Sequence, residues 1–311
     1  MRDALVGCTG FVGSNLAEQH NFSACYHSTD IETAYGTEPD LLVYAGVRAE
    51  MFLANQDPEA DYKLIQQAMD NIQKIAPKQI VLISTVAVYS NVKSVDEDTE
   101  IPLSEGTAYG RNRLSLEMWV VENYPNSLVV RLPAIYGKNL KKNFLYDYIH
   151  KIPALLKDTK YEELAGIEPE LEHFYVPQGN GFYKCRTLTK EESIYLKVTF
   201  EKIGFSALNF TDSRSRYQFY PLNRLWKDIC VALQADVHYV NLVTPPVSVE
   251  DVYQMLEGKT FKNEMNKPPF AYDIYTKHSS LYGSTVSHYI MSREEELSAV
   301  REFVSFYKES R

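Results

Sequence analysis

Residues 4–16 read Ala-Leu-Val-Gly-Cys-Thr-Gly-Phe-Val-Gly-Ser-Asn-Leu, and this stretch decides the fold. An apolar run enters three regularly spaced glycines (Gly7, Gly10 and Gly13), and a helix is expected after them. Glycine permits a tight turn with positive φ and lets the backbone approach a ligand closely. A helix that begins beyond such a turn offers free N–H groups and the positive end of its dipole to an anion. The stretch therefore predicts a site for the pyrophosphate of a dinucleotide, rather than a tight turn without a ligand.

Short apolar runs alternate with amphipathic segments over about the first 135 residues, which is the rhythm of repeated βαβ units. The apolar runs are residues 4–7, 23–26, 41–45, 80–84 and 128–132. They are rich in Val, Ile and Leu without strict alternation, as expected for parallel strands covered on both faces. Apolar residues at helical spacing predict a helix over Pro58 to Ile75, and Leu114 to Val121 belongs to another. The pattern predicts an α/β, doubly wound parallel-sheet Rossmann fold.

The composition changes at about residue 138. Residues 151–210 are charged and Tyr-rich, with a turn expected at residues 177–181, and we expect them to form a largely helical lid. Residues 239–243 (Tyr-Val-Asn-Leu-Val) resemble a late strand, and an amphipathic helix is expected over Ser292 to Tyr307. We therefore predict a dinucleotide-binding Rossmann domain at 1–137 and a smaller, mostly helical substrate-binding or lid region at 138–311. Within the latter, residues 239–255 are expected to return to the Rossmann sheet.

Composition narrows the class of protein. The 311 residues carry a net charge of −9, which argues against a nucleic-acid surface. No apolar run approaches the roughly 20 residues needed to span a bilayer, and the first strand begins too early for a signal peptide. We therefore expect a cytoplasmic protein without nucleic-acid or membrane partners. The four cysteines lack CxxC spacing and the seven histidines form no metal-binding pair, so neither disulfides nor a protein-held metal is expected.

The spacing Gly-x-x-Gly-x-x-Gly after a strand resembles the extended short-chain dehydrogenase/reductase family, the NAD-dependent epimerase/dehydratase group. Within it the chain is similar to UDP-galactose 4-epimerases and nucleotide-4-keto-sugar reductases. Further segments resemble the family in order: the cofactor loop at 40–49, the strand of the catalytic hydroxyl at 83–89, the YxxxK position at 109–113, and the next strand and loop at 131–137. The similarity covers residues 4–145, is patchy over 214–255 and is absent from 151–210.

The resemblance implies a bound NAD or NADP. The residues implied to bind it are Gly7, Thr9, Gly10, Phe11, Val12, Gly13, Asp30, Ala45, Gly46, Arg48 and Pro133. Sites that prefer NAD usually carry Asp or Glu at the end of the second strand. Asp30 stands there and could hydrogen-bond the ribose or adenine, or could be a turn or helix-capping residue, while Ser28 could accept a 2′-phosphate. No arginine lies nearby to clamp such a phosphate, which favours NAD.

The resemblance also implies a catalytic set of Thr85, Tyr109 and Arg113. Thr85 would orient the substrate oxygen, Tyr109 would be the acid/base, and Arg113 would be the cation. Lowering a tyrosine pKa from about 10 to about 7 requires roughly 4 kcal/mol of preferential stabilisation of the phenolate. A cation four residues along the same helix face could supply this.

Arg113 stands where the family has lysine, and two interpretations follow. The guanidinium could do the work of the lysine with altered geometry, or the chain could be a cofactor-binding protein with a degraded active site, a sensor or scaffold. Sugar dehydratases of the family carry an Asp-Glu pair after the catalytic hydroxyl, and this chain has Val86 and Ala87 there. Dehydration is therefore not expected, and the reactions that remain are epimerisation and reduction of a 4-keto sugar. A further alternative is a reductase that acts on a carbonyl compound without a nucleotide.

The substrate expected from the resemblance is a nucleotide-linked sugar. The residues expected to contact it are Asn143, Phe144, Lys142 and Arg216, with Arg214 as a second choice for the diphosphate. Family members often dimerise through the helices that correspond here to residues 58–75 and 109–121. A homodimer is therefore an expectation by analogy.

Overall fold

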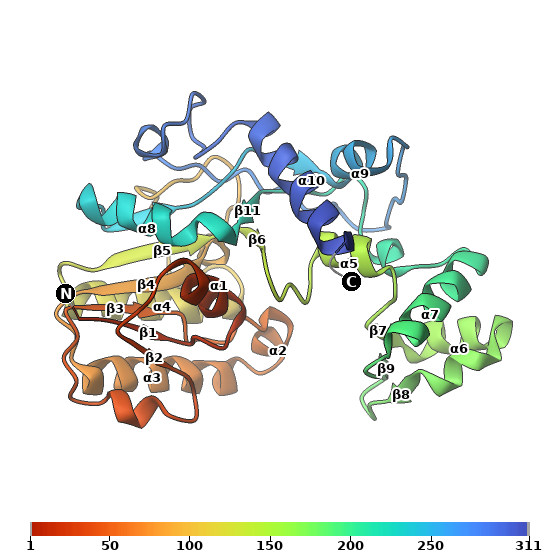
Figure 1. Cartoon of the computed structure of the whole chain (residues 1–311), viewed down its shortest axis with the longest axis horizontal. Coiled ribbons are helices and arrows are strands. Elements are labelled where there is room, and N and C mark those ends of the chain that lie inside the picture. The colour runs from red at the N-terminus through yellow and green to blue at the C-terminus, as the bar shows by residue number, and fades with distance from the viewer. Residues whose placement is uncertain (1, 310–311) are drawn as a thin grey trace. The chain divides into compact units, whose positions relative to one another are not determined.

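The computed structural model describes residues 2–309 and contains a six-stranded parallel sheet (Figure 1). Its strands are β1 (Asp3–Val6), β2 (Ala24–Tyr26), β3 (Leu41–Tyr44), β4 (Ile80–Thr85), β5 (Leu128–Leu132) and β12 (Tyr239–Asn241). Their spatial order is β2-β1-β3-β4-β5-β12, and every neighbouring pair is parallel. The predicted α/β doubly wound fold is confirmed. The chain order reverses between β1 and β3, which is where open α/β sheets bind ligands.

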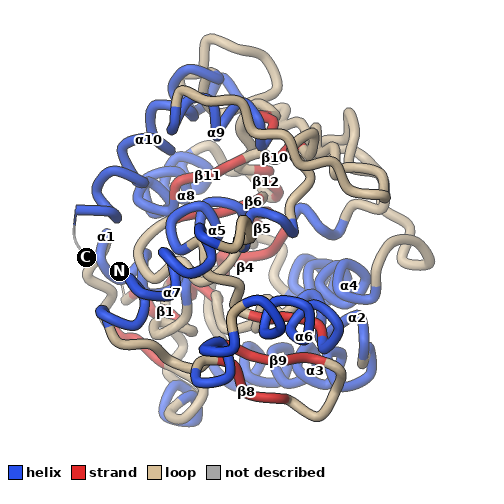
Figure 2. Tube along the Cα trace, turned by 90° about the vertical axis from the view of Figure 1, so that its right-hand side faces the viewer, coloured by secondary structure: helices blue, strands red, loops and turns tan. Residues whose placement is uncertain are grey.

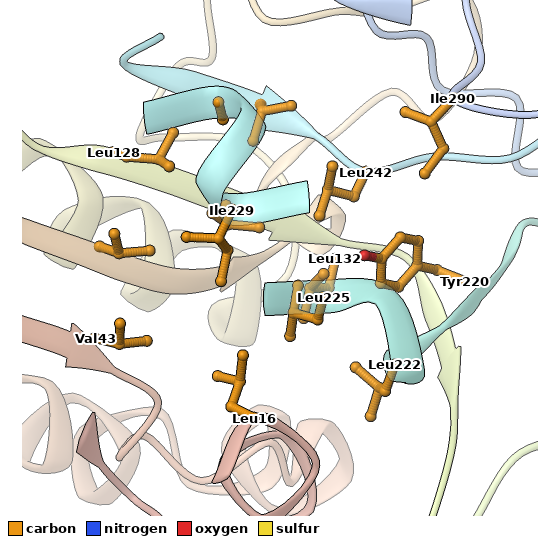
Figure 3. Packing of buried hydrophobic residues seen from close by; sticks show 14 of the residues in the cluster. Leu16, Val43, Leu128, Leu132, Tyr220, Leu222, Leu225, Ile229, Leu242 and Ile290 are labelled. Carbon is orange, nitrogen blue, oxygen red and sulfur yellow. The ribbon is translucent and has the colours of Figure 1, made fainter. Parts of the chain in front are cut away.

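Helices cover both faces of this sheet. Apolar side chains of α1 (Phe11–Gln19) and α8 (Leu225–Gln234) pack on one face, and those of α3 (Pro58–Ile75) and α4 (Ala108–Asn123) pack on the other. Figure 3 shows the buried cluster on the first of these faces, where Leu16 of α1, Ile229 of α8 and Val43 of β3 belong to one group of packed side chains. Each such fully buried aliphatic side chain contributes about 1.5–3 kcal/mol.

The start and end of α3 are encoded locally. Asp57 accepts the Ala60 N–H at 3.0 Å as the N-cap, and Pro58 occupies the first helical position, where its missing N–H costs nothing. Ala76 ends the helix in the left-handed conformation, with a φ of 55°. Ile65 and Ile72, seven residues apart, lie on its fully buried face.

The described chain divides into two compact units. The first unit comprises residues 1–140, 216–248 and 270–301, and the second comprises 141–215, 249–269 and 302–311. Besides the large sheet, the first unit contains two short strand pairs: β6 (Ala134–Tyr136) is parallel to β11 (Phe219–Pro221), and β10 (Arg216–Tyr217) is antiparallel to β13 (Val247–Ser248). It also contains the short helix α2 (Met51–Gln56). Its 3-10 turns are η1 (Ile31–Ala34), η2 (Val86–Val88), η5 (Leu222–Arg224) and η6 (Ser279–Tyr282). Helix α10 (Arg293–Glu309) closes the described chain.

The second unit contains helices and a small sheet. The helices are α5 (Phe144–His150), α6 (Asp158–Ile167), α7 (Lys190–Lys202) and α9 (Val249–Glu257), with the 3-10 turns η3 (Pro169–His173) and η4 (Ala207–Phe210). The strands β7 (Leu155–Lys157), β9 (Phe182–Cys185) and β8 (Tyr175–Pro177) pair antiparallel in that order, and Figure 2 shows β8 and β9 beside α6. The expected turn near residues 177–181 joins β8 to β9, whereas the sheet itself was not predicted. Across residues 2–309, no helix has the length and apolar character to cross a membrane.

Candidate active site

The glycine turn between β1 and α1 is shaped by close backbone approaches. Gly7 has a φ of +90° and donates its N–H to the Tyr26 carbonyl at 2.8 Å. A Cβ on Gly7 would lie 2.5 Å from the Ala45 carbonyl oxygen, and a Cβ on Gly13 would lie 2.1 Å from the Gly7 carbonyl oxygen. Both distances are too short for real Cβ atoms. Therefore β1, α1 and the loop after β3 can meet here only because these two positions are glycine.

Gly10, the middle glycine, has an ordinary backbone conformation and less crowded surroundings than Gly7 or Gly13. It is exposed and extended (φ −74°, ψ 171°), and within 4 Å its Cβ would meet only the Gly7 carbonyl oxygen, at 3.1 Å. It is the N-cap of α1 without a side-chain cap hydrogen bond, and the first N–H groups of a helix have no acceptor within the helix. Such a surface fits a phosphate, because the N–H groups and the helix dipole both favour an anion. Thr9, Phe11 and Val12 border it.

The other expected cofactor residues follow the carboxyl ends of parallel strands. Asp30 follows β2, then Ala45, Gly46 and Arg48 follow β3, and Pro133 follows β5. The Asp30 carboxylate accepts the His27 main-chain N–H at 2.7 Å and lies 3.0 Å from the His27 ring nitrogen Nε2. These are the contacts of a turn residue, the other role considered for Asp30.

Thr85 and Tyr109 come together where β4 ends and α4 begins. Thr107 caps α4, and its hydroxyl accepts the Gly110 N–H at 3.1 Å. A Cβ on Gly110 would lie 2.2 Å from the Ala87 carbonyl oxygen, so this glycine lets the first turn of α4 approach the turn after β4. As a result, the Tyr109 phenol lies close enough to the Thr85 hydroxyl for that hydroxyl to lower its pKa.

The Tyr109 phenol is buried, with 6% of the residue exposed. Burial raises its pKa, the charge of Arg113 lowers it, the charge of Asp61 raises it, and hydrogen bonds with Arg113 and Thr85 lower it. The net direction is upward from 10, opposite to the lowering that a general base needs. The phenol is therefore protonated at neutral pH, which suits it to donate a proton.

Arg113 is held inside the protein on several sides. Its guanidinium carbon lies 4.2 Å from the centroid of the Tyr109 ring, a cation–π arrangement. Nη1 forms an ion pair with Asp61, and Nη2 donates to the Arg48 carbonyl at 2.5 Å. With 5% of the residue exposed, the guanidinium uses these donors within the chain. The structure thus brings the three expected catalytic residues together and places Asp61 beside them, a residue not expected from the sequence.

A buried polar network lies next to this set and was also missed. Arg131 binds the Glu117 carboxylate through Nε at 3.1 Å and Nη2 at 2.7 Å, and its Nη1 donates to the Tyr89 hydroxyl at 2.8 Å. Ser84, the residue before Thr85, donates to Glu117 at 2.5 Å. Glu117 is fully buried, so the network fixes β4 and β5 against α4. The one sequence signal was a carboxylate on the helix face four residues beyond Arg113.

The expected substrate residues fall in separate units. In the second unit, Asn143 caps α5 by accepting the N–H groups of Leu145 and Tyr146, and the Phe144 side chain is buried. Lys142 precedes them in the same unit and is exposed. In the first unit, Arg216 lies on β10 and donates through Nη2 to the Pro246 carbonyl at 3.3 Å. Arg214, the second choice, is paired with Asp212 in the second unit.

Residues 1–154 match the family model described as "RmlD substrate binding domain". No protein of curated function matches the chain by sequence. Among solved structures, a dTDP-4-dehydrorhamnose reductase from Clostridium acetobutylicum is 13% identical with a TM-score of 0.63, covering 99% of this chain and 100% of the other. RMD from Pseudomonas aeruginosa, complexed with NADPH, is 15% identical with a TM-score of 0.63 and full coverage of both chains.

The UDP-glucose 4-epimerase of Thermotoga maritima, solved with UDP-glucose, is 15% identical with a TM-score of 0.62, covering 100% of this chain and 99% of the other. At these identities the similar structures establish the fold, which agrees with the order of the motifs along the chain. The match over residues 1–154 agrees with the resemblance of this chain to the extended short-chain dehydrogenase/reductase family.

Proposed function

We propose that the protein is an NAD(P)H-dependent reductase of a carbonyl group on a nucleotide-linked sugar. The observation that carries the proposal is the buried, protonated Tyr109 phenol within reach of the Thr85 hydroxyl. The names of similar structures add support, since they include dTDP-4-dehydrorhamnose reductases and UDP-sugar 4-epimerases.

In the proposed reaction the cofactor supplies the hydride and the protein supplies the proton. When bound, the reduced nicotinamide supplies the hydride that adds to the carbonyl carbon. The glycine turn at residues 7–13, with Ala45 and Gly46, would hold the dinucleotide. The Tyr109 hydroxyl donates its proton to the carbonyl oxygen, and Thr85 orients that oxygen. Solvent then reprotonates Tyr109, so each turnover consumes one hydride and one proton.

Reduction fits this phenol better than epimerisation does. A 4-epimerase must first remove a proton from a sugar hydroxyl, which calls for a tyrosine whose pKa is lowered towards neutrality. The pKa of Tyr109 is displaced in the other direction, mainly by burial. The two residues after Thr85, Val86 and Ala87, cannot act as acid or base, which also disfavours dehydration.

The proposal extends to substrate and assembly. Residues 138–311 would bind the substrate. The proposed contacts are Arg216 in the first unit, for the diphosphate, and Lys142, Asn143 and Phe144 in the second. NAD is favoured over NADP because no arginine stands near Asp30 to hold a 2′-phosphate. A homodimer through α3 and α4 would cover apolar side chains that are exposed on those helices: Tyr62, Leu64 and Met118.

A second candidate is a cofactor-binding protein without turnover, acting as a sensor or scaffold. One observation favours it: the guanidinium of Arg113 binds Asp61 and the Arg48 carbonyl, whereas the family's lysine would be available to the cofactor.

The experiment combines calorimetry with a substrate panel. NADH and NADPH binding is measured first, and then oxidation of each is followed by absorbance with UDP-, GDP- and dTDP-linked 4-keto sugars. Binding with turnover that disappears in Tyr109→Phe supports the reductase. Binding without turnover on any sugar supports the second candidate. Absence of binding contradicts both.

A further inference from the structure

A buried carboxylate stands behind Arg113. Asp61, near the start of α3, is only 7% exposed. It accepts a hydrogen bond from Asn112 Nδ2 at 2.8 Å and forms an ion pair with Arg113 Nη1. Two consecutive residues of α4 are thus joined to one carboxylate on a neighbouring helix.

Helix packing alone does not account for this pair. Taking a guanidinium and a carboxylate out of water carries a desolvation penalty, and apolar side chains of similar volume often join two helices as well or better. The ion pair also fixes the orientation of a group that lies against the Tyr109 ring, at 4.2 Å from its centroid.

We propose that Asp61 is a positioning residue: it holds the Arg113 guanidinium over the Tyr109 ring and offsets its charge, which keeps the phenol in the form that donates a proton. The catalytic consequence rests on the proposed reductase function. The cancellation of charge does not, and it can be measured without turnover.

The groups around Tyr109 come from several elements. Arg113 is on the same helix, Asp61 on α3, Thr85 at the end of β4, and Asn55 on α2 accepts the Tyr109 main-chain N–H at 3.0 Å. Of these, Arg113 and Asp61 are the charged groups that act on the phenol, and their effects are opposite in sign. Removing the carboxylate would therefore leave the positive charge uncompensated beside the ring.

The test is to titrate Tyr109 directly. Protein labelled with ¹³Cζ-tyrosine is followed by NMR from pH 7 upwards, and the Tyr109 resonance is assigned by its absence in Tyr109→Phe. In Asp61→Asn, which keeps the shape and one acceptor, the midpoint should fall by at least about one pH unit. An unchanged midpoint in folded Asp61→Asn would overturn the proposal.

A matched control lies on the same helix. Asp70 pairs with Lys74 at 2.7 Å, and both side chains are about half exposed. Asp70→Asn should leave the Tyr109 midpoint unchanged. A shift there as large as in Asp61→Asn would mean that the effect is not specific to Asp61 and would also overturn the proposal.

A second variant covers the case in which an unpaired buried guanidinium prevents folding. Arg113→Gln/Asp61→Asn removes both charges and keeps two hydrogen-bonding side chains. If the two charges cancel, the Tyr109 midpoint of this double variant stays within about half a unit of the wild type. A shift of more than about one unit would show that they do not cancel.

The kinetic measurement separates positioning from structural support. In Asp61→Asn the fall of kcat at high pH should begin at least about one unit lower than in the wild type, with cofactor affinity unchanged. Asp61→Glu should restore the wild-type profile. If the wild type reduces no sugar, the proposed function fails, while the NMR titrations still decide the role of Asp61.

Discussion

The guanidinium carbon of Arg113 lies 4.2 Å from the centroid of the Tyr109 ring, one helical turn away on the same face of α4. A guanidinium and a lysine ammonium differ in shape and in their hydrogen-bond donors, so the two are not interchangeable at this place. It gives a specific meaning to the arginine that stands in the family's lysine position.

Exchanging Arg113 for lysine should therefore damage the site. Arg113→Lys loses the guanidinium over the Tyr109 ring and has a shorter reach to Asp61 and the Arg48 carbonyl, so we expect turnover to fall about tenfold and the free energy of unfolding to fall by ~1–2 kcal/mol. Steady-state kinetics and urea unfolding measure the two effects. A variant more active than the wild type would instead identify a degraded site.

Tyr109→Phe should separate chemistry from binding. It removes the proton donor and keeps the ring under the guanidinium, so kcat should fall by about 10²- to 10⁴-fold. Calorimetry should give an unchanged affinity for the dinucleotide. Retained turnover would remove Tyr109 from the mechanism.

The two glycines Gly10 and Gly13 should respond differently to alanine. Gly13→Ala places a Cβ 2.1 Å from the Gly7 carbonyl oxygen and should destabilise the fold by more than about 2 kcal/mol. Gly10→Ala brings its Cβ to 3.1 Å from the Gly7 carbonyl oxygen, a less severe approach, so it should cost less stability than Gly13→Ala and should weaken dinucleotide binding at least about tenfold. Equal affinity in Gly10→Ala and the wild type would contradict a close approach of the dinucleotide to Gly10.

Glu296 should make the stability of the first unit depend on pH. This carboxyl is fully buried in α10, accepts the Phe219 N–H at 2.8 Å and the Thr244 hydroxyl at 2.9 Å, and burial raises its pKa to about 8 from 4.5. Between these values the folded chain keeps a proton that the unfolded chain has lost. The free energy of unfolding therefore falls as pH rises from about 4.5 to 8, by up to ~4 kcal/mol.

Urea unfolding at pH 5, 6.5 and 8 checks this expectation. Glu296→Gln keeps the acceptor oxygen and removes the titration, so its stability should decline much less over this range than that of the wild type. Glu294→Gln, at an exposed position of the same helix, is the control and should follow the wild type. Parallel curves for the wild type and Glu296→Gln would rule out this carboxyl as the source.

The parts of the fold that could be predicted are those with a local signal. Strands β1 and β3 of the large sheet are apolar runs buried on both faces, and the turn at Gly7 needs a positive φ that glycine supplies. The sheet β7-β9-β8 gave no such signal, because its strands have three or four residues and include exposed apolar side chains such as Leu155 and Val176.

The residues of the candidate site also divide into those with a local sequence signal and those without one. Thr85 and Tyr109 could be named because each stands in a short recognisable motif. Asp61 could not, because its partner Arg113 is 52 residues away and the sequence between them says nothing of how α3 and α4 align. The effect of burial on the pKa of Tyr109 could likewise not be predicted from the sequence, because it depends on every element packed around the ring.

The chain alternates between the two compact units, with residues 216–248 and 270–301 returning to the first after excursions into the second. No single cut therefore releases either unit as one continuous polypeptide. Replacing the whole second unit with that of another protein would require exchanging three separate segments, residues 141–215, 249–269 and 302–311.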